Sequence, residues 1–115
     1  MWKIIYDKLR ENNLNPYAPG QHKGFCFKPY CIIKEGLQMP SIQSNKVGQK
    51  TIDIIVFVPI RSYKEIEPYV NKIRLVLKEL KFLRKTGFES PIITDDEKKA
   101  YTMSIEYVLQ KKLEG

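Results

Sequence analysis

Three side chains in the first third of the chain could bind a metal ion or act as nucleophiles: His22, Cys26 and Cys31. A structural zinc site uses paired CxxC or HxxxH ligands, and the spacing of these residues provides neither pair. His22 is the only histidine, so no second imidazole can complete a metal site or a proton relay. The cysteines lie an odd number of residues apart, which puts them on opposite faces of a regular strand and opposes a disulfide. We expect reduced, structural cysteines and a solvent-exposed loop histidine.

A second candidate chemistry is that of a metal-dependent nuclease. Asp53 lies in a strand-like segment, and Glu79-Leu80-Lys81 follows it in the chain. A nuclease needs such carboxylates and the lysine to converge on one metal-bound water. Glu79 and Lys81 are predicted to lie on a helix and to point to different sides, so this convergence fails.

The acidic triplet Asp95-Asp96-Glu97 could bind a cation, but a charge run of this kind is usually a solvated turn or a helix cap. The six glycines are scattered singly, so the chain has no Gly-rich phosphate-binding loop. The sequence therefore predicts no catalytic residue, no metal site and no cofactor. We expect a protein that is not an enzyme.

The formal net charge is +7 and the pI is about 9.4, which favours nucleic acids, acidic proteins or membrane surfaces as partners. Part of this charge falls on one predicted stripe, a candidate basic surface formed by Arg74, Lys78, Lys81 and Lys85. Phosphate contacts there could be extended by Lys46, Lys50 and Arg61. A solvated helix face is the commoner role of such a stripe, and no aromatic stacking motif accompanies it. A small basic nucleic-acid-binding module is therefore the alternative hypothesis for the function.

The segment that must position these side chains is Thr51–Ile60, the most strand-like run of the sequence. Its even positions are all β-branched and apolar: Ile52, Ile54, Val56, Val58 and Ile60. The odd positions are mixed, so the pattern has the period of two that a strand with one buried face requires. We expect this strand in the middle of a sheet.

A helical pattern from about Ser62 to about Lys85 supplies the helix that covers this strand. Ser62-Tyr63-Lys64-Glu65 fits a capping box, although Pro68 also allows a later start. One broad apolar stripe is expected to face the sheet: Ile66, Tyr69, Val70, Ile73, Leu77, Leu80 and Leu83.

Two apolar residues of this predicted helix, Leu75 and Phe82, lie outside the main stripe and are flanked by charges. An extra apolar ridge of this kind suggests a contact with another protein. Leu75 and Phe82 are therefore our candidate subunit interface.

The segments before the central strand predict one helix, a loop and one further strand. Apolar residues recur at helical spacing in residues 1–13, which indicates an amphipathic helix that docks on the sheet. Residues 12–24 are rich in Asn, Pro and Gly and form a loop. Phe25–Lys34 reads as a strand that becomes regular near Tyr30, because Pro29 cannot donate a hydrogen bond to a sheet.

Residues 35–50 resemble a long hairpin connection, and such loops are often functional. Its candidate contact residues are Gln43, Asn45, Lys46 and Lys50. Near the C-terminus, Tyr101–Gln110 alternates as a half-buried antiparallel strand does, and a short extra strand is expected near Ile92. The sequence thus predicts the α+β class: a small, mostly antiparallel sheet with an N-terminal helix and one long helix packed on it, in the order α-β-β-α-β.

Residues 1–115 are expected to form a single domain, since a chain of this length supports one core. Charges in the N-terminal segment interrupt any apolar run of a signal peptide. No window approaches the roughly 20 apolar residues of a membrane span. We expect a protein that folds in the cytosol and has no membrane partner.

Three segments resemble a known protein family. They are Lys28–Lys34 (KPYCIIK), Ile52–Tyr63 (IDIIVFVPIRSY) and Pro91–Lys112 (PIITDDEKKAYTMSIEYVLQKK). In element order and size they look like the small tail terminator proteins of tailed bacteriophages, also called tail-completion or tail-to-head joining proteins. The resemblance is closest to phage-derived proteins of Gram-positive hosts, and phage-tail-like bacteriocins use relatives in the same place.

This resemblance implies a structural virion protein that assembles into a homo-hexameric ring on the last ring of the tail tube. The ring would stop tube growth and join the tail to the head connector or neck protein. The protein would be made in the bacterial host cytoplasm and would end at the neck end of the virion tail. In such a ring Leu75 and Phe82 would face a neighbouring subunit, and the basic surface could line a channel through which DNA passes. The family offers no residue-level site pattern, so these interface residues are our own inference.

Overall fold

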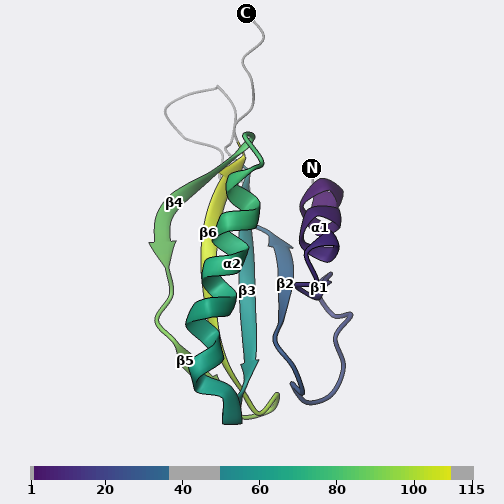
Figure 1. The fold of residues 1–115 in the computed structure, drawn as a ribbon, viewed down its shortest axis with the longest axis vertical. Coiled ribbons are helices and arrows are strands. Elements are labelled where there is room, and N and C mark those ends of the chain that lie inside the picture. Colours follow the sequence, from purple (N-terminus) through teal and green to yellow (C-terminus); the bar gives the residue numbers. More distant parts are fainter. Residues whose placement is uncertain (1, 37–49, 110–115) are drawn as a thin grey trace, which may run out of the picture.

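The computed structural model describes residues 2–36 and 50–109, which form an α+β fold with one mixed sheet (Figure 1). The elements follow the order α1 (Trp2–Glu11), β1 (Pro16–Tyr17), β2 (Tyr30–Glu35), β3 (Thr51–Pro59), the 3₁₀ helix η1 (Ile60–Glu65), α2 (Ile66–Lys78), β4 (Leu83–Glu89), β5 (Ile93–Asp95) and β6 (Ala100–Leu109). The predicted fold class is confirmed. None of the helices in these residues is long and apolar enough to cross a membrane.

The sheet has the strand order β1-β2-β3-β6-β4, and β5 also pairs with β6. β3 pairs antiparallel with β2 on one side and with β6 on the other, which confirms its predicted central place. Because β3 occupies one side of β6 as far as Ala100, β5 lies on the β4 side of β6. Only the short strand β1 is parallel to its neighbour. The two edges of the sheet are therefore formed by β1 on one side and by β4 and β5 on the other.

Both α-helices lie on one face of the sheet, with α2 along β3 and β6 and α1 beside β2 (Figure 1). The main core between them contains the even residues of β3, from Ile52 to Val58, which are buried as the alternation predicts. The prediction is wrong for its last residue, Ile60, which begins η1 and is 40% exposed. Two long-range hydrogen bonds hold the helices to the rest of the fold. Nε1 of Trp2 donates to the carbonyl of Ile33 at 2.8 Å, and the hydroxyl of Tyr69 donates to the carbonyl of Leu14.

A second, smaller core lies on the opposite face of the sheet. Its buried residues are Cys26, Tyr30, Phe57 and Ala100. Tyr30 and Phe57 pair across β2 and β3, and the connection between β1 and β2 covers them. Both cysteines are free thiols, as predicted, and each belongs to a different core, since Cys31 lies in the main one.

The long helix is shorter than predicted at both ends. It begins at Ile66, after the 3₁₀ helix η1, and no side chain caps either helix, so the predicted capping box at Ser62 is wrong. Ser62 itself has a non-helical backbone, with φ −119° and ψ 40°. Pro59 has no backbone N–H, so it cannot donate a hydrogen bond that would continue β3. Its φ of −53° suits the start of the 3₁₀ helix η1, which follows directly.

The predicted helix to Lys85 is also wrong, because α2 ends at Lys78 and Leu83–Glu89 forms the strand β4. Leu80 and Leu83 continue the apolar spacing of the helix, but they lie in a turn. In this turn the amide of Leu83 donates to the carbonyl of Leu80. Beyond it, the backbone pairs with β6. Gly87 has φ +90° within β4, where the register shifts between Lys85 and Glu89, and this is a conformation that favours glycine.

The remaining strands agree with the sequence predictions. β2 begins at Tyr30 after Pro29, β6 covers the alternating segment, and β5 is the expected extra strand beside Ile92. β1 was not expected, because it is only two residues long inside a segment with turn composition. The loop residues Gln43, Asn45 and Lys46 lie outside the residues that the structure describes.

Candidate functional site

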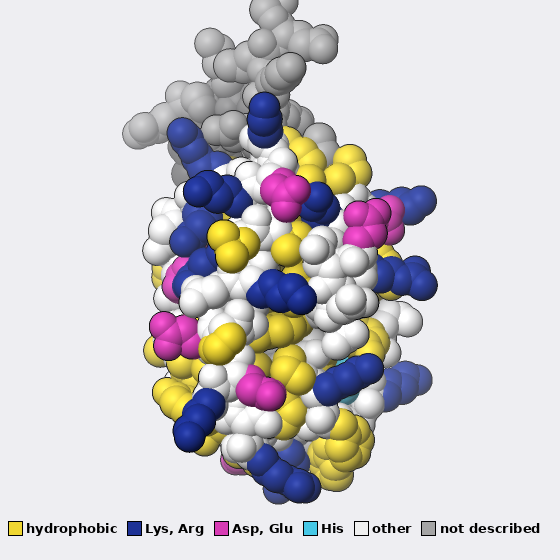
Figure 2. All heavy atoms as spheres, viewed as in Figure 1, with side chains coloured by type: hydrophobic (Ala, Val, Ile, Leu, Met, Phe, Trp, Pro, Cys, Tyr) yellow, Lys and Arg dark blue, Asp and Glu magenta, His cyan; other side chains and the backbone are white. Residues whose placement is uncertain are grey.

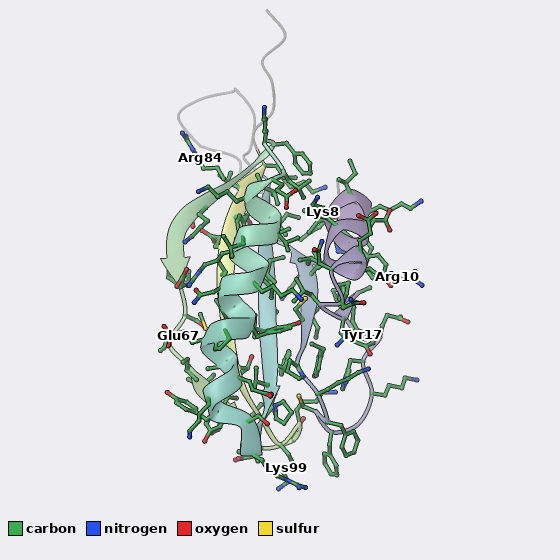
Figure 3. All side chains as sticks on the ribbon, viewed as in Figure 1. Lys8, Arg10, Tyr17, Glu67, Arg84 and Lys99 are labelled. Atoms are coloured by element: carbon green, nitrogen blue, oxygen red, sulfur yellow. The ribbon has the colours of Figure 1, made fainter. Side chains whose placement is uncertain are left out.

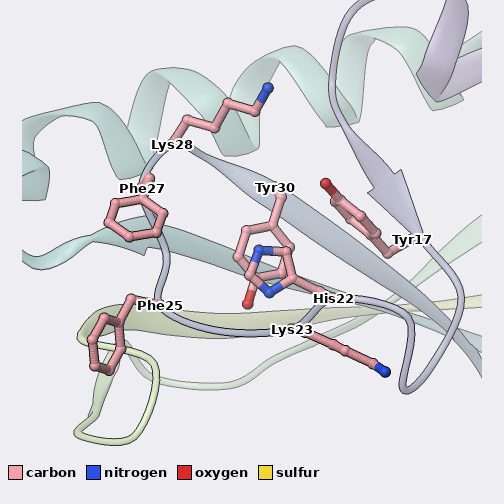
Figure 4. Close-up of a pocket in the computed structure, with 7 residues that line it drawn as sticks. All are labelled: Tyr17, His22, Lys23, Phe25, Phe27, Lys28 and Tyr30. Atoms are coloured by element: carbon pink, nitrogen blue, oxygen red, sulfur yellow. The ribbon is translucent and has the colours of Figure 1, made fainter.

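A surface pocket of about 290 Å³ lies against the connection between β1 and β2 (Figure 4). Five of its seven lining residues carry rings and the other two are lysines: Tyr17, His22, Phe25, Phe27, Tyr30, Lys23 and Lys28. Phe25 and Phe27 stand on one side of it and Tyr17 on the other, with His22 in front of Tyr30 between them. We call these seven residues the aromatic pocket.

Stacked rings form the floor of the aromatic pocket. The rings of His22 and Tyr30 are parallel within 7° with centroids 3.7 Å apart, and Tyr30 stacks in turn on Phe57 at 4.8 Å. Tyr17 meets both His22 and Tyr30 edge-on. Since Tyr30 and Phe57 belong to neighbouring strands, the sheet itself holds the floor in place.

The loop that carries the pocket residues is tied to the β5–β6 turn by Lys98. The Nζ atom of Lys98 donates to the carbonyl of His22 at 3.2 Å and to that of Gly24 at 3.3 Å. The carbonyl of Lys98 accepts from the amide of Cys26 at 2.8 Å. At the end of the loop, Nδ2 of Asn15 donates to the carbonyl of Pro29 at 3.0 Å. Several contacts thus hold this loop in one conformation although it has no regular secondary structure.

This anchored loop presents two phenylalanines to solvent. Phe25 is 52% and Phe27 is 84% exposed, and their ring centroids lie 6.4 Å apart. Full burial of a phenylalanine side chain contributes roughly 1.5–3 kcal/mol. The folded chain does not gain most of this free energy at Phe27, and a partner that covers the two rings would gain it. Lys23 and Lys28 flank the two rings in the sequence. The arrangement can bind an apolar group that carries or adjoins negative charge.

Burial dominates the electrostatics of the site. It lowers the pKa of His22, and the nearby charge of Lys98 lowers it further, so His22 is neutral at pH 7. Burial raises the pKa of Tyr30 well above its usual range and that of Cys26 to about 11. Cys26 is therefore a protonated thiol and a poor nucleophile. Nδ1 of His22 and the hydroxyl of Tyr30 are buried without a hydrogen-bond partner among the described residues.

The structure separates the two residues of the predicted subunit interface. Leu75 lies on α2 and is 68% exposed, as an interface residue would be. Phe82 lies in the turn after α2, is partly buried and packs against the main core. The two side chains therefore do not form one ridge on a helix, because the helix ends before Phe82.

The predicted basic stripe is also divided. Arg74 and Lys78 lie on α2, Lys81 lies in the following turn, and Lys85 lies on β4. Arg74 and Lys85 both form salt bridges with Glu89, at N–O distances of 2.5 and 3.6 Å. The stripe is thus neither continuous nor free of acidic partners.

Basic side chains are instead distributed over the molecule. In Figure 2 the Lys and Arg side chains of the α2 face are spread from end to end with carboxylates between them. Figure 3 places Arg84 near one end of the sheet, Lys99 at the other, and Lys8 and Arg10 on α1. Lys50, the described member of the predicted loop contacts, forms a salt bridge with Glu35.

The two acidic residues of the predicted nuclease site, Asp53 and Glu79, face different partners. Asp53 faces Glu106 across β3 and β6, and burial together with the charge of Glu106 raises the pKa of Asp53. Glu79 pairs with Lys8 of α1 at 3.1 Å. Within residues 2–36 and 50–109, no group of three His, Cys, Asp or Glu side chains could hold a metal ion.

The sequence contained a signal for the aromatic pocket that strand prediction obscured. In Lys23-Gly24-Phe25-Cys26-Phe27-Lys28 the phenylalanines alternate with a cysteine, as they would in a strand. The structure buries Cys26 and exposes both rings without any strand in these residues. Comparisons of the chain with family models, with curated proteins and with solved structures gave no match.

Proposed function

We propose that this protein is a structural subunit that assembles into a closed ring, in the manner of the tail terminators that its sequence resembles. The ring would cap the tail tube of a bacteriophage or related particle, stop its growth and join the tail to the head connector. The proposed partners are further copies of the chain, expected as a hexamer, a tail-tube protein and a connector or neck protein.

The observation that carries this proposal is the location of exposed apolar side chains at both edges of the sheet. The aromatic pocket lies beside β1, with Phe25 and Phe27 exposed. At the opposite edge, Phe88 of β4 is 63% and Ile93 of β5 is 58% exposed. Exposed apolar side chains that gather in one patch, as Phe25 and Phe27 do, mark sites of contact with another molecule.

The aromatic pocket and the exposed Phe88 of β4 are two different apolar surfaces of one chain, which favours head-to-tail association. Such heterologous contacts generate rings when the rotation between subunits closes and filaments when it does not. β4 also pairs only with β6 among the described strands, so its other edge can meet a neighbour. A ring subunit needs only surfaces of this kind, and no catalytic residue.

The proposal is tested by electron microscopy of tail tubes. Tail-tube protein from the same source is allowed to polymerise with and without the purified protein. We expect added ring density at one end of each tube and an arrest of tube growth. Tubes that grow to the same length, with bare ends, would refute the proposed function.

One observation favours single-stranded nucleic acid as an alternative ligand. Phe25 and Phe27 are exposed between two lysines, and proteins that bind single strands combine aromatic stacking with basic side chains. Binding of this kind would weaken steeply with salt concentration. Fluorescence anisotropy with a labelled oligonucleotide at low salt tests it, and undetectable binding would exclude it.

A further inference from the structure

We propose that the β1–β2 loop, residues 18–29, is a pH-sensitive switch: protonation of His22 releases the loop from the sheet, which opens the aromatic pocket and uncovers the second core. The switch goes beyond the proposed ring function, because it operates within one chain and needs no partner.

The imidazole of His22 lies inside the contact that closes the β1–β2 loop. Its ring stacks on Tyr30 of β2 with the centroids 3.7 Å apart, and the ring of Tyr17 of β1 meets it edge-on at 5.0 Å (Figure 4). Tyr30 itself stacks on Phe57 of β3. A loop side chain is thus packed on side chains of the sheet, so a change in this one ring acts on the position of the whole loop.

This packing suits only the neutral form of the ring. Nδ1 of His22 is buried and has no hydrogen-bond partner among the described residues. A protonated imidazole carries an N–H on both nitrogens, so one of them would lie at this buried position without an acceptor. Water supplies that acceptor when the loop is open. Protonation therefore favours the open loop.

The charges around His22 act in the same direction. The ammonium group of Lys98 donates to the carbonyl of His22 itself and to that of Gly24. Burial lowers the pKa of His22, and the positive charge of Lys98 lowers it further. The charged residues of the pocket lining, Lys23 and Lys28, are also basic. A positive charge on His22 would therefore oppose the contacts with Lys98 that hold the loop.

The acidic residues of the neighbouring β5–β6 turn do not offset this repulsion. Asp95 is near enough to raise the pKa of Tyr30, but its carboxylate accepts from the amide of Lys98 within its own turn. Asp96 and Glu97 are exposed, so solvent screens their charges. Among the charged groups near His22, it is Lys98 that shifts the pKa of the imidazole.

The other titratable side chains of this contact are neutral at pH 7 and below: Tyr17, Tyr30 and Cys26. His22 is therefore the group that gains a charge here between pH 7.5 and 5.5. In the open loop it has its ordinary pKa of 6.5. When the closed loop takes up no proton, the ratio of open to closed loop rises about tenfold over this range, which is the upper limit of the effect.

Cys26 provides a probe of this opening. Its thiol is 5% exposed in the second core, whereas Cys31 is fully buried in the main core. Dithiodipyridine labels thiols in acid as well as at neutral pH, and mass spectrometry of peptides reads the two sites separately. Each labelling rate is divided by the rate of the urea-unfolded chain at the same pH.

This relative rate should rise by about two- to tenfold for Cys26 when the pH falls from 7.5 to 5.5. At both pH values Cys26 should be labelled at least about tenfold more readily than Cys31, because the loop opens without unfolding of the main core.

Two variants separate the charge of the ring from its packing. His22→Phe keeps a ring for the stack but cannot take up a proton, so the relative labelling rate of Cys26 should not change over this pH range. Lys98→Met removes the neighbouring positive charge. Cys26 should then be more accessible at pH 7.5 and should respond less to acid than in the wild type. Lys99→Met is the matched control and should behave as the wild type does.

A relative rate for Cys26 that does not change with pH in the wild type, or an equal rise in His22→Phe, would overturn the switch. Equal protection of Cys26 and Cys31 would also overturn it, because the thiol would then be reached only by unfolding of the whole chain. So would a response to acid in Lys98→Met as large as that of the wild type, since the charge of Lys98 would then not act on the ring.

Discussion

Lys98→Met should release the loop of the aromatic pocket without unfolding the protein. Methionine keeps an unbranched apolar stem but cannot donate to the carbonyls of His22 and Gly24. Both bonds are long, at 3.2 and 3.3 Å, and the one to Gly24 is exposed to solvent. Each is therefore expected to contribute at the lower end of the usual range, about 0.5–1 kcal/mol.

Loss of both bonds should destabilise the closed loop by about 1–2 kcal/mol, which corresponds to roughly 5–30-fold more frequent opening. Hydrogen exchange followed by mass spectrometry measures this opening directly. Peptides that cover residues 21–28 should exchange faster by that factor, whereas peptides from the central strand β3 should be unchanged. The matched control is Lys99→Met, because the side chain of Lys99 makes no hydrogen bond among the described residues.

Equal exchange of residues 21–28 in wild type and Lys98→Met would refute this account of the loop. Faster exchange throughout the sheet would refute it in another way, because it would show that Lys98 supports the whole fold. In either case the two side-chain bonds of Lys98 would not be what specifically holds this loop.

Three further predictions concern the core and the pH dependence of stability. Ile54→Ala should lower the free energy of unfolding, measured in urea, by about 2–5 kcal/mol. Ile55→Ala, at a half-buried position, should lower it clearly less. Equal losses would contradict the conclusion that the even residues of β3 face the helices. Tyr69→Phe should cost about 1 kcal/mol in the same assay because the bond to Leu14 is lost, and an unchanged midpoint would show that this bond contributes nothing. The pKa of His22 in the folded protein lies below its ordinary value of 6.5. As the pH is lowered, His22 therefore becomes protonated in the unfolded chain before it does so in the folded protein, and the stability should fall below pH 6.5. Thermal melts should show a smaller fall in His22→Phe, and an identical pH profile would contradict the lowered pKa.

The elements with strict periodicity were predictable from the sequence. The alternation of Ile52 to Val58 specified a central strand with one buried face, because a period of two has no other regular explanation. Pro29 marked the start of β2 by removing a donor. These signals are local, so no knowledge of the tertiary structure was needed.

The errors arose where tertiary pairing overrode a local pattern. Leu80 and Leu83 continue the helical spacing of α2, yet the backbone from Leu83 onward gains a partner strand in β6 and leaves the helix. The alternation of Phe25 and Phe27 with Cys26 was visible in the sequence, but the irregular loop that exposes both rings was not, for a similar reason. It depends on the bond network of Lys98, which is distant in the sequence and whose position only the folded sheet determines.

The most direct test of the central claim is sedimentation velocity of the wild-type protein over a wide range of concentration. The account predicts a reversible step from monomer to one closed species, expected to be a hexamer, with no larger polymer. Sedimentation as a monomer at every concentration, or open-ended growth into filaments, would contradict it.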